Sequence, residues 1–113
     1  MKKLEIIIRP DNLEDIKTIL NNHGCGGMTI FSAMGCGNQK GEKGTEFKGV
    51  RLNINLIPKI QVNAVIEDSI LEEVLINIKE KLSTGNVGDG KVFIYDISDV
   101  MRIRTGERGV KAI

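Results

Sequence analysis

The stretch Thr84-Gly85-Asn86-Val87-Gly88-Asp89-Gly90-Lys91 lies between an apolar helical pattern and an apolar strand pattern. Glycine tolerates positive φ, so the three glycines of this stretch allow backbone N–H groups to crowd around one point. Successive inward-pointing N–H groups form an anion-binding concavity, and the neighbouring Lys91 adds a full positive charge. The stretch does not have the Walker A spacing G-x-x-x-x-G-K-[ST], and it precedes a strand rather than a helix. On its own it indicates a tight turn, and phosphate binding depends on other groups that converge there.

Apolar periodicity on both sides of this stretch predicts a helix before it and a strand after it. The buried positions of the helix recur at helical spacing: Ile70, Leu71, Val74, Leu75, Ile78 and Leu82. The strand spans 92–97, and 100–104 is predicted as a short fifth strand with Arg102 and Arg104 on one face. Residues from about 105 to 113 are expected to form a mobile C-terminal tail.

The N-terminal part of the chain shows the same strand-then-helix pattern. Residues 4–9 form an apolar strand, which Pro10 ends because proline cannot donate a hydrogen bond to a sheet. A helix follows with one apolar stripe, and it ends near Gly24, which suits a left-handed backbone position. Residues 28–34 form the next predicted strand. Two strands are thus expected to flank the first helix.

Both helices begin with a pattern typical of a capping box. Asp11 is followed by Glu14, and Ser69 is followed by Glu72, so each pair could satisfy the free N–H groups of a helix start. His23, near the end of the first helix, is interpreted as a cap rather than as a catalytic base, because no carboxylate or nucleophile adjoins it in sequence.

A polar, glycine-rich segment separates the second strand from the third. Between Asn38 and Lys48 only Phe47 is large and apolar, and residues 50–55 alternate as a half-exposed strand would. Loops longer than about 12–15 residues are uncommon in compact domains and tend to be functional or disordered. We predict a mobile loop over about 37–55 that other molecules touch, with an ordinary variable surface loop as the alternative. The third strand is predicted over 60–66.

The resulting order is β-α-β, long loop, β-α-β, which is the ferredoxin-like α+β plan. We expect one domain over residues 1–113, with a four-stranded antiparallel sheet and both helices on one face. Several strands carry consecutive apolar residues, such as Ile6, Ile7 and Ile8, and the helices can cover one face of the sheet only. The second face is expected to be aliphatic and to be covered by self-association.

Composition limits the classes of function. The net charge of +1 gives no strong field for nucleic acid, and no apolar run approaches the roughly 20 residues that a membrane span needs. Residues 1–5 do not resemble a signal peptide, so a cytoplasmic protein without direct membrane insertion is expected. Cys25 and Cys36 lack C-x-x-C spacing, and the chain has one histidine, so two reduced thiols are favoured over a zinc site.

Five pieces of the sequence together have a familiar pattern: Ile8-Arg9-Pro10 with Leu13-Glu14-Asp15, Gly35-Cys36-Gly37-Asn38-Gln39-Lys40-Gly41, Leu56-Ile57-Pro58-Lys59, the stretch from Thr84 to Phe93, and Arg102-Ile103-Arg104-Thr105-Gly106-Glu107. The last two pieces, at this distance from one another, are the most specific. On these pieces the chain resembles the P-II family of nitrogen regulatory signal-transduction proteins over nearly its whole length.

The resemblance implies a homotrimer that binds ATP or ADP in clefts between subunits. With Mg²⁺ and ATP it also implies binding of 2-oxoglutarate, after which the long loop changes conformation and decides which partner docks. The implied partners are an ammonium channel, which would recruit the protein to the membrane, and nitrogen-assimilation enzymes or regulators. The implied function is regulation rather than catalysis.

The resemblance also implies roles for individual residues. The implied nucleotide contacts are Thr29 near the adenine, then Gly88, Asp89, Gly90, Lys91, Arg102 and Arg104 at the phosphates, with Gly35, Gly37, Asn38, Gln39 and Val87 as the other nucleotide-binding residues. The implied 2-oxoglutarate contacts are Gln39, Lys40, Gly41 and Lys59, with Gln39 also coordinating Mg²⁺. Hard oxygen ligands such as an amide suit Mg²⁺, and the fixed fork of arginine suits phosphate.

Three positions depart from the family pattern. Phe47 stands where many bacterial members have a tyrosine that is uridylylated, so no uridylylation is expected there, and Phe47 could instead be an apolar anchor for a partner or a loop-tip side chain on its own subunit. Asn38 replaces a frequent arginine, and Asn63 replaces a frequent acidic residue. These two changes bear on nucleotide affinity and on discrimination between ATP and ADP.

Two other classes share this topology. An RNA-binding module would place aromatic residues on the open sheet face, where aliphatic side chains are expected here. A small nucleotide-binding enzyme would need a nucleophile and base, or an acidic pair, and neither occurs at useful spacing.

Overall fold

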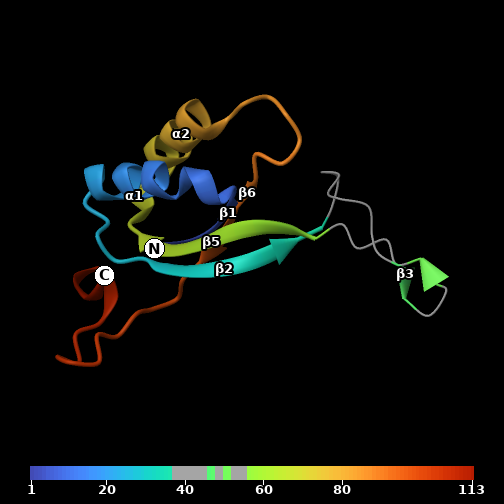
Figure 1. Ribbon diagram of the computed structural model, residues 1–113. Helices are drawn as coiled ribbons and strands as arrows, with labels where there is room; N and C mark the ends of the chain where they lie inside the picture. Colours follow the sequence, from blue (N-terminus) through green and yellow to red (C-terminus); the bar gives the residue numbers. More distant parts are fainter. Residues whose placement is uncertain (37–45, 48–49, 52–55) are drawn as a thin grey trace.

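The computed structural model describes residues 1–36, 46–47, 50–51 and 56–113 (Figure 1). Its elements, in chain order, are strand β1 (Lys2–Ile8), 3-10 helix η1 (Pro10–Asn12), helix α1 (Leu13–Asn22), strands β2 (Thr29–Gly35), β3 (Glu46–Phe47), β4 (Val50–Arg51) and β5 (Ile57–Ile66), 3-10 helix η2 (Asp68–Ile70), helix α2 (Leu71–Leu82), strand β6 (Lys91–Asp96) and 3-10 helix η3 (Gly109–Ala112). Helix and strand order agree with the ferredoxin-like prediction.

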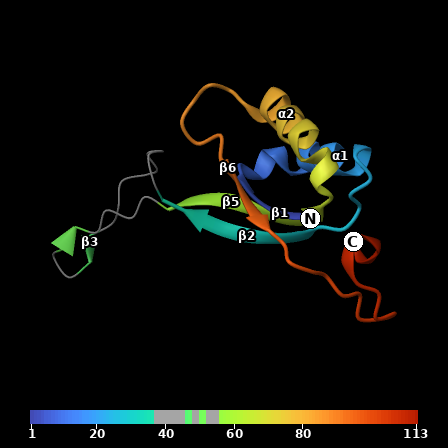
Figure 2. The same cartoon turned by 180° about the vertical axis from the view of Figure 1, so that it is seen from behind.

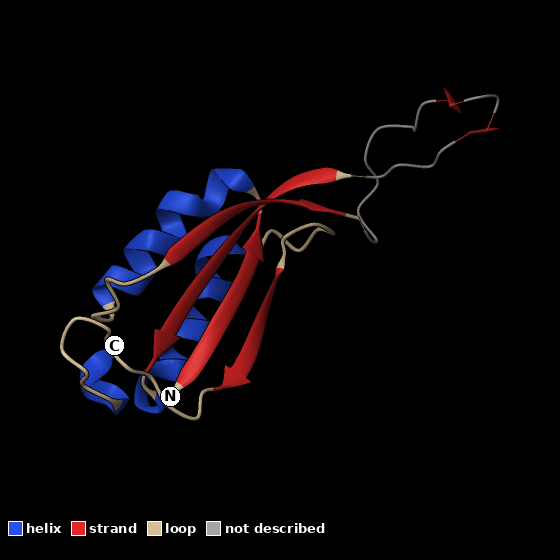
Figure 3. Cartoon of the chain, turned by 90° about the horizontal axis from the view of Figure 1, so that it is seen from below, coloured by secondary structure: helices blue, strands red, loops and turns tan. Residues whose placement is uncertain are grey.

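The four long strands form one antiparallel sheet in the order β2-β5-β1-β6. Ile6 of the central strand β1 lies opposite Val62 of β5 and opposite Val92 of β6. Both helices lie against one face of this sheet (Figure 3). The short strands β3 and β4 pair with each other, with Phe47 opposite Val50, and β4 covers the first two residues of the strand pattern noted over 50–55.

The core lies between the helices and the sheet and is aliphatic, as the composition predicted. Alternate residues of the two central strands, one stripe of each helix and one thiol are buried: Leu4, Ile6, Ile8, Val62, Ala64, Ile66, Ile16, Ile19, Leu20, Val74, Ile78, Leu82 and Cys25. Among the described residues no polar or charged side chain is buried. Burial of apolar area is therefore the main stabilising contribution within the subunit.

The open face of the sheet differs from its prediction. Because Ile30 and Val92 share the helix-facing side with Ile6, the alternation of a strand places Phe31, Phe93 and Tyr95 on the other side. The prediction of an aliphatic open face is therefore wrong, and with it the argument against an RNA-binding module that used it. The face is also partly polar, since the Gln61 amide and the Tyr95 hydroxyl donate to the Glu5 carboxylate at 3.2 and 3.3 Å.

The helix starts also differ from their predictions. Each α-helix follows a 3-10 turn, and the residues that precede α1 and α2, Asn12 and Ile70, make no side-chain capping hydrogen bond. Glu14 pairs with Lys17, and Ser69 donates to Glu67, so neither predicted capping box forms. At the other end of α1 the cap interpretation holds, because His23 Nδ1 lies 2.8 Å from the Ile19 carbonyl oxygen. Gly24 has the expected positive φ of 76°.

The predicted fifth strand over 100–104 is wrong. Only Met101 makes a bridge, to Arg108, and the segment between them is a turn closed by backbone bonds between Arg102 and both Gly106 and Glu107. Asp99 holds this turn by accepting from the N–H groups of Val100 and Gly109. The Arg102 guanidinium bonds the Lys111 carbonyl at 2.9 Å. The last residues thus fold into a turn and η3, and the predicted mobility of 105–113 stays a prediction.

Candidate functional site

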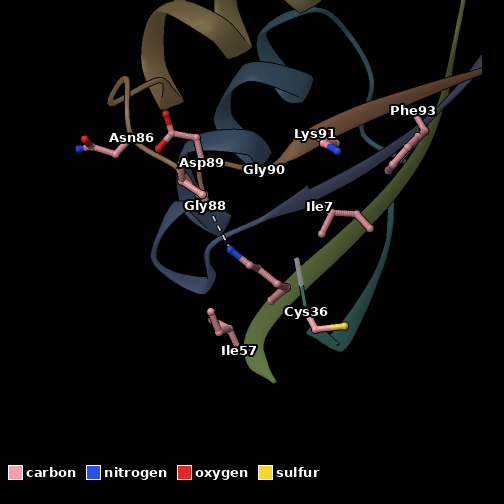
Figure 4. Close-up of a pocket in the computed structure, with 12 residues that line it drawn as sticks. Ile7, Cys36, Ile57, Asn86, Gly88, Asp89, Gly90, Lys91 and Phe93 are labelled. Carbon is pink, nitrogen blue, oxygen red and sulfur yellow. Dashed lines mark hydrogen bonds between the residues drawn. The ribbon is translucent and has the colours of Figure 1, made fainter. Parts of the chain in front are cut away.

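A cavity of about 510 Å³ lies on the open-face side of the sheet, beside the glycine-rich turn (Figure 4). In this view the turn residues Gly88 and Gly90 lie on one side of the cavity, and Cys36 and Ile57 lie on the other. Its lining comes from the ends of four strands and from the turn: Ile7, Gly35, Cys36, Ile57, Lys59, Asn86, Val87, Gly88, Asp89, Gly90, Lys91 and Phe93. The size suits a small-molecule ligand.

The glycine-rich turn has a backbone that only glycine accepts easily. Gly85, Gly88 and Gly90 have φ values of 80°, 100° and 109°. Gly90 also lies directly against strand β1, because a Cβ placed on it would lie 1.9 Å from the Ile7 carbonyl oxygen. The turn therefore sits against the central strand of the sheet, at the edge of the cavity.

Asp89 holds the turn closed from within. Its Oδ2 accepts hydrogen bonds from the backbone N–H groups of Thr84 at 2.7 Å and of Gly85 at 3.2 Å. Its Oδ1 accepts from the Thr84 hydroxyl and, at 2.6 Å, from the Arg9 guanidinium. These partners, the Thr84 hydroxyl foremost and Arg9 next, hold the pKa of the Asp89 carboxyl far below its ordinary value. The carboxylate thus serves the turn itself, and its negative charge faces partners within the subunit.

The lowered pKa predicts an acid dependence of stability. The unfolded chain would take up a proton at Asp89 near pH 3.8, whereas the folded chain holds the carboxylate ionised to lower pH. The stabilisation is therefore complete above about pH 4 and is lost as pH falls toward the lower, folded-state pKa. We expect Asp89→Asn to destabilise at pH 7 and to flatten the loss between pH 5 and pH 2. Urea midpoints across that range measure this, with Asp11→Asn, exposed in η1, as control; equal slopes would contradict it.

Two lysines bring positive charge to the same cavity. Lys59 Nζ on β5 donates to the Gly88 carbonyl at 3.0 Å, which is the dashed line in Figure 4. Burial lowers the pKa of Lys59, and the nearby charge of Arg9 lowers it further while Asp89 opposes the change. Lys91, the first residue of β6, lines the cavity from the other side of the turn. A cavity with two ammonium groups and a glycine turn can hold an anion such as a phosphate.

The structure brings seven of the predicted site residues to this one cavity: Gly35, Lys59, Val87, Gly88, Asp89, Gly90 and Lys91. It does not bring three others there within one chain. Thr29 begins β2 while Gly35 ends it, and Arg102 and Arg104 follow β6 while Lys91 begins it. Figures 1 and 2 show the glycine-rich turn and the C-terminal segment at opposite ends of the sheet.

The predictions for Gly37, Asn38, Gln39, Lys40 and Gly41 fall outside the described residues. The backbone of Phe47 lies in β3, and the prediction for its side chain as a partner contact stays a prediction.

Sequence reasoning assigned no role to Arg9, which contacts the turn twice. Its NH1 binds Asp89, and its NH2 donates to the Val87 carbonyl at 3.0 Å. The topology could have indicated this contact, because Ile7 lies opposite Lys91 in the antiparallel pair and Arg9 follows two residues later. The predicted site residues also did not include three apolar residues of the lining, Ile7, Ile57 and Phe93.

Comparison with known proteins decides the family. The family model for nitrogen regulatory protein P-II matches residues 1–107. The chain belongs to the P-II family. It is 43% identical over 114 residues to a nitrogen regulatory protein P-II from Rhodospirillum rubrum, and 41% identical over 114 residues to one from Azospirillum brasilense, with both chains of each pair covered in full. A nitrogen regulatory protein P-II 1 from Methanothermobacter thermautotrophicus is 42% identical over 113 residues, which covers all of this chain and 97% of that one.

Membership of the P-II family confirms the predicted resemblance and the predicted class of function. The protein is a nitrogen regulatory signal transducer, and it is a regulator rather than an enzyme. Within the described part of the chain, neither helix combines the length and the apolar character needed to cross a bilayer.

Proposed function

We propose that the protein senses ATP or ADP together with 2-oxoglutarate and regulates nitrogen-assimilation targets by direct contact. The observation that carries this proposal is the single cavity in which the glycine-rich turn, Lys59 and Lys91 meet. Phosphates carry several negative charges, and among the described residues the buried core has no charged side chain that could balance them. The turn and the two lysines offer a donor set that fits such a group.

The proposed sensor is a homotrimer whose site is completed by a neighbouring copy. Lys91 begins β6 and Arg102 follows the other end of that strand, so at about 3.3 Å per residue the strand alone separates them by roughly 17 Å. If Arg102 and Arg104 bind the same nucleotide as Lys91, they must therefore come from another subunit. Assembly would also cover the open sheet face, where Phe31 and Phe93 are 48% and 43% exposed.

The 2-oxoglutarate subsite is proposed at Lys59 with Gln39, Lys40 and Gly41. Lys59 lies at the cavity and would face one carboxylate of the keto acid. Mg²⁺ would be held by Gln39, the phosphates and 2-oxoglutarate, so that each ligand completes part of the other's site and the two bind with positive coupling. The segment around Phe47 would then present the signal to an ammonium channel or to nitrogen-assimilation proteins in the cytoplasm.

Replacement of Lys91 by glutamine is expected to weaken ATP binding at least tenfold, because one direct charge on the phosphates is lost. The thermal midpoint should barely change, since Lys91 is exposed and outside the core. Calorimetry with ATP measures this, and Lys17→Gln, which removes a partly exposed lysine on α1, is the matched control. Equal ATP affinity in Lys91→Gln and the unchanged protein would remove Lys91 from the site.

Two further measurements test the sensor and the assembly. Calorimetry with 2-oxoglutarate should show binding only when Mg²⁺ and ATP are present, and Lys59→Gln should abolish it while ATP still binds. Absence of 2-oxoglutarate binding under those conditions would end the sensing proposal.

Light scattering should give a mass near three times 12.4 kDa, and a mass of one chain would end the trimer proposal.

A further inference from the structure

Arg9 joins the end of the central strand to the glycine-rich turn. It follows β1 directly, and one planar guanidinium binds the Asp89 carboxylate at 2.6 Å and the Val87 carbonyl at 3.0 Å. Both side chains of the pair are partly buried, with 28% of Arg9 and 22% of Asp89 exposed. A charged pair of this geometry and partial burial is stronger than an exposed one.

The contact reaches the whole turn through Asp89. The same carboxylate that binds Arg9 accepts from the backbone of Thr84 and Gly85, six and five residues before Gly90. Arg9 itself donates to the carbonyl oxygen of Val87, which lies in the turn between Gly85 and Asp89. A turn with three positive-φ glycines has many alternative conformations when it is free, so fixing it in advance removes an ordering cost from ligand binding.

Arg9 does not line the cavity, although its charge acts on Lys59, which does. The lining of the cavity includes Val87, Asp89 and Lys59 but not Arg9. The charge of Arg9 nevertheless lies close enough to disfavour the ammonium form of Lys59. Arg9 could therefore act on a bound anion in two ways, by its charge or by the shape that it gives to the turn. Its own charge is largely balanced by the adjoining Asp89 carboxylate.

We infer that Arg9 is a positioning residue for the anion site, which acts by fixing the glycine-rich turn through Asp89 and Val87. This inference deepens the proposed nucleotide site and rests on it for the ligand, while the effect on the turn can be measured without any ligand. The planar fork is essential to it, because a lysine can supply the charge but cannot hold the carboxylate and the carbonyl with two fixed donors.

The test compares Arg9→Gln, Arg9→Lys and the control Lys17→Gln. Hydrogen exchange of the backbone amides of 84–91, without ligand, reports the turn, and calorimetry with ATP reports the site. For Arg9→Gln we expect exchange about tenfold faster and ATP binding about tenfold weaker. For Arg9→Lys we expect an intermediate change in both, about threefold, despite the retained charge. Lys17→Gln should match the unchanged protein.

A double substitution tests whether Arg9 and Asp89 act as one unit or as two independent contacts. If Arg9 works through Asp89, then Arg9→Gln combined with Asp89→Asn should speed exchange in 84–91 by less than the product of the two single effects. A full product would overturn the inference. The inference would also be overturned if Arg9→Gln sped up exchange and weakened ATP binding while Arg9→Lys changed neither. In that case a positive charge at position 9 would be sufficient without the planar fork. If Arg9→Gln does not fold, the Arg9→Lys comparison still decides.

Failure of the proposed nucleotide binding would give a different result from failure of the inference about Arg9. In that case the unchanged protein would not bind ATP, while the exchange measurements would still show whether Arg9 fixes the turn. Slow exchange in the unchanged protein and faster exchange in both Arg9 variants would support the positioning role even then. Unchanged exchange in both variants, with ATP binding intact, would overturn the inference and leave the nucleotide site standing.

Discussion

Gly90→Ala is expected to destabilise the protein by more than about 3 kcal/mol, or to prevent folding, because two penalties combine at this position. The backbone φ of Gly90 is 109°, a region in which a residue with a Cβ is strained by roughly 1–2 kcal/mol. The added Cβ would also lie 1.9 Å from the Ile7 carbonyl oxygen and 3.0 Å from the Ile7 carbonyl carbon. These atoms belong to the backbone of the central strand, so they cannot turn aside as a side chain would.

Gly85→Ala in the same turn is the matched control. Gly85 has a similar positive φ of 80°, but a Cβ placed on it would meet no atom within 4 Å. It should therefore cost only the backbone strain, about 1 kcal/mol. Urea unfolding at fixed protein concentration compares the two variants with the unchanged chain. Similar free energies of unfolding for Gly90→Ala and Gly85→Ala would show that contact with β1 is not what demands glycine at position 90.

The order of elements could be predicted because each element buries a periodic apolar stripe. Leu4, Ile6 and Ile8 alternate along β1, and Ile16, Ile19 and Leu20 recur along α1, so both periods are visible in sequence. The ferredoxin-like arrangement follows, since four strands and two helices in this order leave few ways to bury those stripes. The nature of the open face was missed because consecutive apolar residues suggested an aliphatic surface where Phe31 and Phe93 in fact lie.

Local signals failed where several hydrogen-bonding schemes compete. A capping box needs the chain to enter the helix directly, and here 3-10 turns precede both helices. The segment 100–104 was predicted as a strand, but within the described part of the chain it contributes one bridge, from Met101 to Arg108, and Asp99 and Gly106 make the hydrogen bonds of a turn instead. Propensity over so few residues is easily overridden by such contacts.

Part of the predicted site lies together within one chain. The glycine-rich turn, Lys59 and Gly35 all line one cavity. Each of them belongs to a piece of sequence on which the resemblance to the family was based. Arg9 was missed because its role comes from strand pairing, which sequence spacing does not display. Arg102 and Arg104 lie elsewhere in the subunit, so any contribution from them depends on the relation between copies, which a single chain does not contain.

Ile6→Ala is expected to lower the free energy of unfolding by about 2–5 kcal/mol, the usual range for removing a buried isoleucine to alanine. Ile6 is fully buried, and its neighbours across both strands, Val62 and Val92, come from the strands on either side of β1. A well-packed aliphatic core cannot collapse around the lost atoms without moving the central strand, so a cavity remains. Because β1 also supports Gly90 and Arg9, this damage should loosen the glycine-rich turn as well.

Ile76→Ala gives the matched control, since it removes the same atoms from a side chain of α2 that is 54% exposed. Alanine favours helix more than isoleucine does, so this variant should stay within about 0.5 kcal/mol of the unchanged chain. Urea unfolding of both variants must use one protein concentration, because assembly of copies would add to the apparent stability. A cost for Ile6→Ala no larger than that for Ile76→Ala would mean that the contacts between helices and sheet do not hold this fold together, and that the support for the turn must come from elsewhere.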